Sequence, residues 1–117
     1  MNRKFDLEDR FVNYAASVMS FAEGLRRSYA NDYLAKQLIR SAGGAALNFA
    51  EMQGAVSDKD YIIKGNLSFK ELKESELNLK ILKLREDDSP LTDQLLGETI
   101  ELIKILRTLI NKRKANL

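Results

Sequence analysis

Apolar residues recur along this chain at alternating spacings of four and three, which is the pattern of helices with one apolar face. The first stripe runs from Leu7 to Leu25, and Asp6 is placed to cap the start of its helix. The second lies between Asn31, which can cap it, and Gly54, which ends it. The first half of the chain therefore predicts two helices.

The second half of the chain predicts two more helices. Ser57, followed by Asp60, resembles a capping box and opens the third apolar stripe. The stretch "EDDSP", residues 86–90, then stops this pattern, with Ser89 placed as the next cap and Pro90 at the first helical position. Sustained two-residue alternation, the signal of strands, is absent from the sequence.

Helices of about 20 to 28 residues that are joined by short loops favour neighbours running in opposite directions. We therefore expect an all-α fold, an antiparallel up-and-down four-helix bundle, with residues 1–117 forming a single domain.

Two adjacent glycines interrupt the second stripe. They lack the spacing and the preceding strand that a phosphate-binding loop requires. Each glycine costs a helix about 1 kcal/mol relative to alanine, so a compensating gain is expected. Close packing of another helix provides one; a local kink is the alternative. The residues predicted to form this packing surface are Gly43, Gly44, Ala45 and Ala46.

Polar residues near the glycines would need partners if they were buried. They are Arg40, Ser41, Asn48, Glu51 and Glu76. We expect a structural polar network in which Arg40 pairs with Glu51 or with Glu76. Two carboxylates also suggest a metal site or acid–base catalysis, but di-iron bundles use Glu-x-x-His pairs, and the sequence indicates no nucleophile.

The amino-acid composition excludes several classes of functional site. The 117 residues include no cysteine and no histidine, which removes thiolate metal sites, the usual zinc ligand and the usual neutral-pH proton shuttle. No apolar run approaches the ~20 residues that span a bilayer, and the first residues lack the apolar core of a signal peptide. We expect a cytoplasmic protein that is not an enzyme and has no cofactor, no metal and no membrane contact.

Charge is nearly balanced, because 19 basic and 17 acidic residues give a net charge of +2. Local clusters matter more than this total. Phosphate contacts are predicted for Arg26, Arg27, Lys104, Arg107, Lys112, Arg113 and Lys114. The alternative for the last three is that they only complement the negative end of a helix.

Residues 37–82 contain four short motifs: Arg40-Ser41, Asn48-Phe49-Ala50-Glu51, Ser57-Asp58-Lys59-Asp60 and Glu76. On these motifs the segment resembles the four-helix-bundle family of proteins encoded in intervening sequences of bacterial 23S rRNA genes, also labelled S23 ribosomal protein. It implies a bundle that assembles into a ring-like homopentamer. The accessory variability proteins of diversity-generating retroelements are similar, and they imply binding of RNA or DNA and of a reverse transcriptase.

Two functions follow from these observations. One is a homo-oligomer that binds nucleic acid through basic patches, with several weak contacts acting together in the assembled ring. The other is a protein-interaction scaffold without nucleic-acid binding. For the scaffold, two surfaces would serve self-association or a partner helix: the packing surface of the glycine pair, and an exposed second apolar stripe on the fourth helix, Leu95, Leu102 and Leu109.

Overall fold

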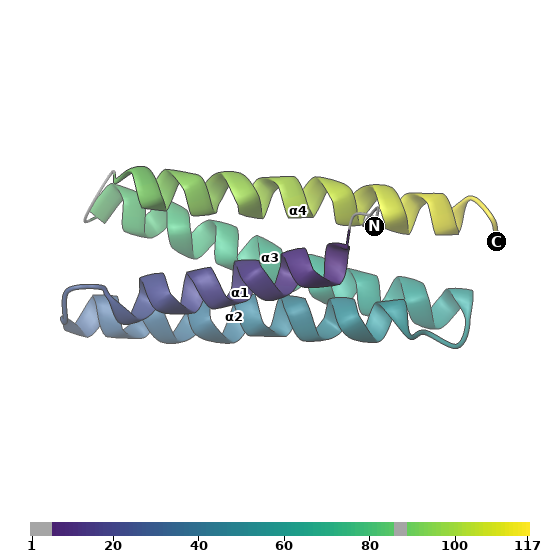
Figure 1. The fold of residues 1–117 in the computed structure, drawn as a ribbon, viewed down its shortest axis with the longest axis horizontal. Helices are drawn as coiled ribbons and strands as arrows, with labels where there is room; N and C mark the ends of the chain where they lie inside the picture. The colour runs from purple at the N-terminus through teal and green to yellow at the C-terminus, as the bar shows by residue number, and fades with distance from the viewer. Residues whose placement is uncertain (1–5, 86–88) are drawn as a thin grey trace, which may run out of the picture.

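The computed structural model describes residues 6–85 and 89–117, so residues 86–88 of the "EDDSP" stretch lie outside the described residues. The described chain forms four helices: α1 (Leu7–Glu23), α2 (Tyr29–Gln53), α3 (Asp58–Arg85) and α4 (Pro90–Lys114). Each helix runs antiparallel to the one before it (Figure 1). The predicted all-α, up-and-down four-helix bundle is confirmed.

Three of the four helix starts carry the caps that the sequence predicts. The side chain of Asp6 accepts the Asp9 backbone N–H, and Ser89 accepts that of Thr92 ahead of the helix that begins at Pro90. Ser57 Oγ accepts the backbone N–H of Asp60 at 3.0 Å. These side chains satisfy backbone donors that the first turn of a helix leaves free.

The start of α2 differs from the prediction. Ser28, and not Asn31, is the N-cap, and its hydroxyl accepts the Asn31 backbone N–H at 3.0 Å. The helix therefore begins three residues earlier than expected. The Asn31 side chain is buried and donates to the Arg26 carbonyl oxygen at 2.9 Å, which closes the loop between α1 and α2.

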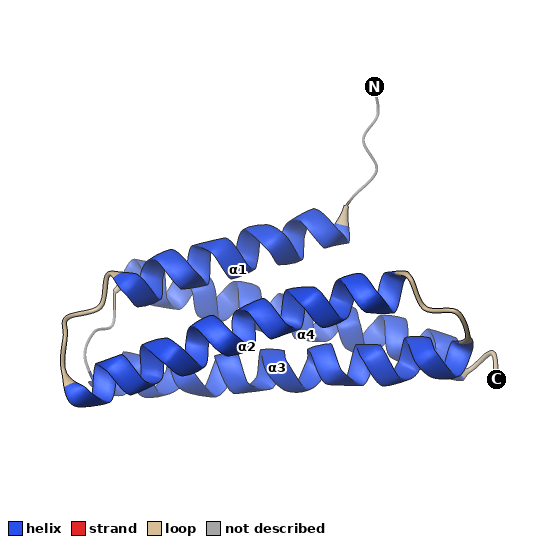
Figure 2. Ribbon diagram, turned by 90° about the horizontal axis from the view of Figure 1, so that it is seen from below, coloured by secondary structure: helices blue, strands red, loops and turns tan. Residues whose placement is uncertain are grey.

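The helices do not pack equally against one another. α2 packs along both α1 and α3, and α4 packs mainly against α3, whereas α1 and α4 share the fewest contacts. α1 is also the shortest helix and stops short of the end where α2 turns into α3 (Figures 1 and 2). The bundle thus has four helices over most of its length and three at that end.

The packing of the core differs between the four-helix part and the three-helix end. Where all four helices are present, the rings of Phe11 and Phe49 stack with centroids 4.2 Å apart, and both are fully buried. At the three-helix end Met52 and Ile110 close in on Gly65 of α3. A Cβ on Gly65 would lie 2.9 Å from Ile110 Cγ1. A side chain at this position would therefore need more space than the present separation of the helices provides.

The second stripe of α4 is not the exposed surface that we expected. Leu95 and Leu102 are buried, and Leu109 is half-buried against the core. The physical reason is that α4 faces α1 on one side and α3 on the other, so two adjacent stripes point inward. The scaffold hypothesis therefore loses this surface.

A buried polar layer crosses the middle of the core, with one side chain from each helix. Tyr14 Oη lies 2.6 Å from Thr99 Oγ1, and Ser41 Oγ lies 2.6 Å from Ser75 Oγ. Burial raises the pKa of Tyr14, and hydrogen bonds from Thr99 and then Ser75 oppose that rise. Because a buried hydroxyl without a partner is costly, this layer fixes how the four helices are aligned.

The glycine pair lies within α2, which is unbroken from Tyr29 to Gln53, so the helix does not break at the glycines. Both neighbouring helices come close at this point. A Cβ on Gly43 would lie 3.1 Å from Met19 Cε of α1, and a Cβ on Gly44 would lie 3.0 Å from Glu71 Cδ of α3. The missing side chains thus leave room for neighbours on two sides.

Candidate nucleic-acid interface

The predicted polar network divides into separate contacts. Arg40 pairs with Glu71 and Glu74 of α3, and these carboxylates, Glu74 first, raise its pKa. The predicted pairs of Arg40 with Glu51 and Glu76 are therefore wrong. Which carboxylates meet Arg40 depends on the register between α2 and α3, and the sequence does not show this register.

The other members of the predicted network also have local partners. Glu51 pairs with Lys64 of α3. Asn48 donates to the Gly44 carbonyl oxygen at 2.9 Å, within its own helix, and Ser41 belongs to the buried polar layer. Ser68 Oγ, which the sequence analysis missed, donates to the Ala45 carbonyl oxygen at 2.8 Å and ties α3 to α2 beside the small residues.

Glu76 lies on the flank of α3 that faces α4, away from Glu51. Its carboxylate pairs with Lys73 at 3.0 Å and with Lys80 at 3.2 Å. Burial alone would raise the pKa of Glu76, but the two ammonium groups outweigh it, so the pKa is lowered. Glu76 therefore stays charged at neutral pH, which does not suit a general acid.

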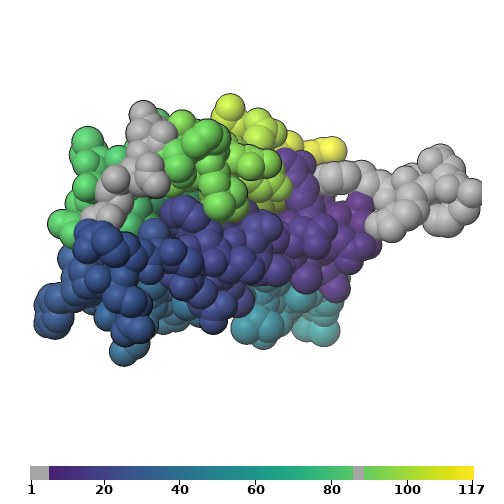
Figure 3. All heavy atoms as spheres, turned by 60° about the vertical axis from the view of Figure 1, so that its left-hand side comes forward, coloured from purple at the N-terminus to yellow at the C-terminus, as the bar shows by residue number. Residues whose placement is uncertain are grey.

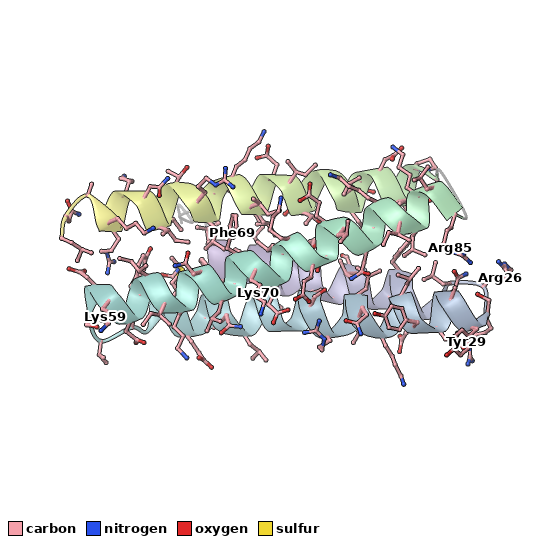
Figure 4. All side chains as sticks on the ribbon, turned by 180° about the vertical axis from the view of Figure 1, so that it is seen from behind. Arg26, Tyr29, Lys59, Phe69, Lys70 and Arg85 are labelled. Carbon is pink, nitrogen blue, oxygen red and sulfur yellow. The ribbon has the colours of Figure 1, made fainter. Side chains whose placement is uncertain are left out.

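The seven predicted phosphate contacts fall on three parts of the molecule. Arg26 and Arg27 lie in the loop between α1 and α2, at the end where Figure 4 shows Arg26 near Arg85. Residues 112–114 lie at the opposite end, because α4 finishes where α2 turns into α3 (Figure 1). Lys104 and Arg107 lie between these ends, on α4.

Two of these arginines already bind neighbouring groups. Arg27 pairs with Asp32 at 2.8 Å. Arg113 pairs with Asp58 at 3.1 Å, and its Cζ lies 3.6 Å from the centroid of the Tyr61 ring. Both therefore have structural contacts that a phosphate would have to compete with.

A third arginine links α4 to α3 through an aromatic ring. Arg107 Cζ lies 5.2 Å from the centroid of the Phe69 ring, and its side chain is exposed. Because the two helices run antiparallel, one turn from this contact brings Lys73 of α3 level with Lys104 of α4. Cations from both helices thus gather along this side of the bundle.

This basic face is defined by exposed cations of α3 and α4: Lys73, Lys80, Lys104, Arg107 and Lys114. Two carboxylates lie beside these cations: Glu76, which is largely buried beneath Lys73 and Lys80, and Glu74, which pairs with Arg40. For Lys104 and Lys114 the described residues offer no carboxylate within ion-pair distance. The face therefore presents more positive charge than the net charge of +2 suggests.

The basic face is hollowed toward the C-terminal end of α4. A groove of about 340 Å³ lies between α3 and α4, lined by Asn66, Phe69, Arg107, Asn111 and Lys114 among others. Its amides and cations are hydrogen-bond donors, which suits the oxygen atoms of a phosphate.

The groove between α1 and α4 has the opposite character. It has a volume of about 720 Å³, and its lining carries Asp6, Asp9, Glu98 and Glu101. Arg10 crosses it and binds Glu98 through two hydrogen bonds of 2.7 and 2.8 Å. In Figure 3 the start of α4, in green, lies directly above α1 on this side. Its acidic lining repels phosphate, so a nucleic acid would meet the basic face instead.

Sequence reasoning missed Lys73 and Lys80. A signal for them was present, since they are seven residues apart and both lie within one helical turn of Glu76. Their alignment with Lys104 and Arg107 depends on the packing of α3 against α4, which only the structure provides.

Two further features of the described chain bear on the site. Within residues 6–85 and 89–117, the acidic residues form no group of three or more that could hold a metal ion. In the same part of the chain, every helix is too short or too polar to cross a membrane.

Comparison with known proteins supports the four-helix fold. No protein-family model matches the chain, and no curated protein matches it. A solved structure from Bacteroides thetaiotaomicron, described as a protein with unknown function from the S23 ribosomal protein family, is similar with a TM-score of 0.79 and 23% sequence identity. The match covers 90% of this chain and 98% of that chain. The two proteins share the four-helix fold, and the family of that structure is the one that residues 37–82 resemble.

Proposed function

We propose that this protein is a non-enzymatic, self-associating four-helix bundle that binds RNA or DNA through the phosphates. The observation that carries the proposal is the basic face, on which cations of α3 and α4 lie together beside the largely buried carboxylate of Glu76, while the neighbouring Glu74 pairs with Arg40. Phosphate contacts of this kind provide affinity without base recognition.

The aromatic residue of this face supports binding without sequence preference. Phe69 is partly buried, and the guanidinium group of Arg107 covers its ring. Its ring is therefore unavailable as a platform on which bases stack. We expect RNA and DNA of different sequence to bind with similar affinity.

Charge reversal on the basic face tests the proposal. Lys73→Glu combined with Lys104→Glu removes two phosphate contacts and adds two negative charges, so affinity for labelled RNA and duplex DNA at 50 mM salt should fall at least about tenfold. Lys36→Glu, an exposed position on α2, makes the same change in charge away from the face and serves as the control. Equal loss of affinity in both variants would contradict the proposed surface.

The interaction scaffold remains a second candidate because α3 exposes apolar side chains, among them Leu77, which is 61% exposed. The homopentameric ring and the reverse transcriptase that the resemblance implies are further predictions. Solution mass and a binding assay with the purified enzyme test them separately from nucleic-acid binding.

A further inference from the structure

The groove between α1 and α4 lies where the bundle is least closed, because these two helices share the fewest contacts. Tyr14 and Leu95 are buried and form its floor, and Leu91 at its edge is 47% exposed. Asn13 and Ser17 of α1 add a polar, uncharged lining. The groove of about 720 Å³ is therefore suited to aromatic side chains that also carry a hydrogen-bonding group.

The rim gives the groove a negative charge. Its lining carries four carboxylates and one cation, Arg10, which binds Glu98. Glu101 is exposed, and the described residues place no cation within ion-pair distance of it. A positively charged occupant would be attracted by this carboxylate. The groove thus suits a protein segment that is both aromatic and cationic.

The loop between α1 and α2 leads into a segment of this kind. Tyr29 is 96% exposed and Tyr33 is 60% exposed. They are four residues apart in α2, so their side chains lie on one side of the helix. Exposed Arg26 precedes them in the loop, and Figure 4 shows Arg26 and Tyr29 at the same end of the molecule. We call Arg26, Tyr29 and Tyr33 the tyrosine corner.

We propose that the tyrosine corner of one copy of this chain docks into the α1–α4 groove of the next copy. The two tyrosine rings cover the apolar floor, their hydroxyl groups donate to the polar lining, and Arg26 lies beside Glu101. The contact specifies the self-association that the proposed function includes, and it rests on that part of the proposed function.

The other tyrosines and charges of the chain support this choice of segment. Of the four tyrosines, Tyr14 is buried and Tyr61 is covered by Arg113, so both exposed ones belong to the corner. Within the same loop and turn, Arg27 neutralises Asp32 at 2.8 Å, so this carboxylate does not repel the acidic rim. Tyrosine and arginine are also the residues that most often dominate protein interfaces.

The contact joins two different surfaces of the same chain, so it is heterologous. Each copy has one corner to offer and one groove to fill, and all of them are used only when the row of copies closes into a ring. This geometry agrees with the ring-like homopentamer that the resemblance implies. Each copy in a ring is held by two contacts, so a contact of modest strength suffices.

The basic face stays open to nucleic acid in this assembly. The groove uses the first half of α4 and ends at Glu101, whereas the cations that α4 contributes to the basic face begin at Lys104. The groove lining and the corner include no residue of α3. Several copies then present their basic faces in one ring, and their phosphate contacts act together.

The first test is the solution mass, measured by light scattering over a range of protein concentrations without nucleic acid. The mass should reach a plateau at more than two copies of the 13.3 kDa chain, and five are expected. Tyr29→Glu combined with Tyr33→Glu sets two carboxylates against the acidic rim and should give monomers with unchanged helix content. A monomeric wild type, a plateau at two copies, or a corner variant that still forms the ring would overturn the proposal.

Two charge reversals elsewhere serve as controls. Lys36→Glu lies on α2, but Lys36 lines a separate hollow with Glu23 of α1. Lys112→Glu makes the same change in charge at the opposite, basic end of the bundle. Both variants should keep the ring. Loss of the ring in Lys112→Glu would mean that the basic end fills the groove, and loss in Lys36→Glu would mean that charge alone controls assembly; either result contradicts the tyrosine corner.

A mixing experiment tests whether two different surfaces meet. Ser17→Trp combined with Glu101→Lys fills the groove and reverses a charge at its rim, and both positions are exposed. This groove variant should be monomeric by itself. In an equal mixture, the corner variant supplies an intact groove and the groove variant an intact corner, so one contact can form. The mixture should give a species of two chains and none larger, and a mixture that stays monomeric would refute the docking.

This contact and the proposed function can fail separately. Lys73→Glu combined with Lys104→Glu should lose affinity for RNA and DNA but keep the mass of the ring. The corner variant should keep the basic face of each chain and lose at least about tenfold in affinity, because several faces no longer act together. A ring that does not bind nucleic acid would contradict the proposed function alone. A corner variant that is monomeric and binds as tightly as wild type would contradict the joint action of the basic faces.

Discussion

Gly65 offers a quantitative test of how closely the three-helix end is packed. A Cβ at this position would lie 2.9 Å from Ile110 Cγ1 and 3.0 Å from Met52 Cε. Both distances are shorter than ordinary contacts between carbon atoms, and Ile110 and Met52 are buried, so they have little room to move.

For Gly65→Ala we expect a net loss of up to about 2 kcal/mol in the free energy of unfolding. Overpacking a core costs about 1–3 kcal/mol, and replacing glycine within a helix returns about 1 kcal/mol. Gly97→Ala is the matched control, because no heavy atom of the described residues that pack around α4 lies within 4 Å of a Cβ there. It should stabilise the protein by about 0.5–1 kcal/mol.

Urea unfolding followed by circular dichroism measures both variants, at one protein concentration because self-association changes apparent stability. Gly65→Ala should unfold at a lower urea concentration than wild type, and Gly97→Ala at a higher one. If Gly65→Ala were as stable as Gly97→Ala, the three helices would not be as close as described.

Three other tests use the same method. Tyr14→Phe should lose about 1 kcal/mol, because its buried hydroxyl bonds Thr99, and an unchanged midpoint would argue against the polar layer. A double-mutant cycle of Arg10→Met and Glu98→Gln should give a coupling of about 0.5–1 kcal/mol, and zero coupling would mean that this pair does not hold α1 to α4. The pKa of Glu76 is lowered, so its stabilisation is present at neutral pH and is lost as the pH falls below its usual value of 4.5. Glu76→Gln should therefore flatten the fall in stability at acid pH, and an unchanged pH profile would contradict the pairing.

The sequence predicted the fold and most helix ends because those features depend on local chemistry. Asp6, Ser57 and Ser89 cap helices through residues only three positions away, and a pattern within one segment shows this. The start of α2 was misplaced because Ser28 and Asn31 are both good caps, and only the loop conformation decides between them.

Contacts between helices could not be predicted in the same way. Arg40 meets Glu71 and Glu74, and not Glu51 or Glu76, because of the angle and register at which α3 crosses α2. The glycine pair was recognised as a place of close approach, whereas the tighter position at Gly65 was not. A single glycine within an apolar stripe gives no indication of which neighbours surround it.

The surfaces were the hardest to predict. The extra apolar stripe of α4 is turned inward, while large apolar side chains that remain outside belong to α3, among them Leu77 and Ile81. The basic face combines cations of two helices, so no single segment of the sequence displays it. Both surfaces depend on which side of each helix the bundle buries.

The most direct test of the proposed function is the salt dependence of nucleic-acid affinity. Dissociation constants for labelled RNA and duplex DNA should be measured from 50 to 200 mM salt. With three to five phosphate contacts on the basic face, the logarithm of the affinity for duplex DNA should fall with the logarithm of the salt concentration with a slope of about −3 to −4.5. An affinity that does not change with salt, or no binding at 50 mM, would contradict the account.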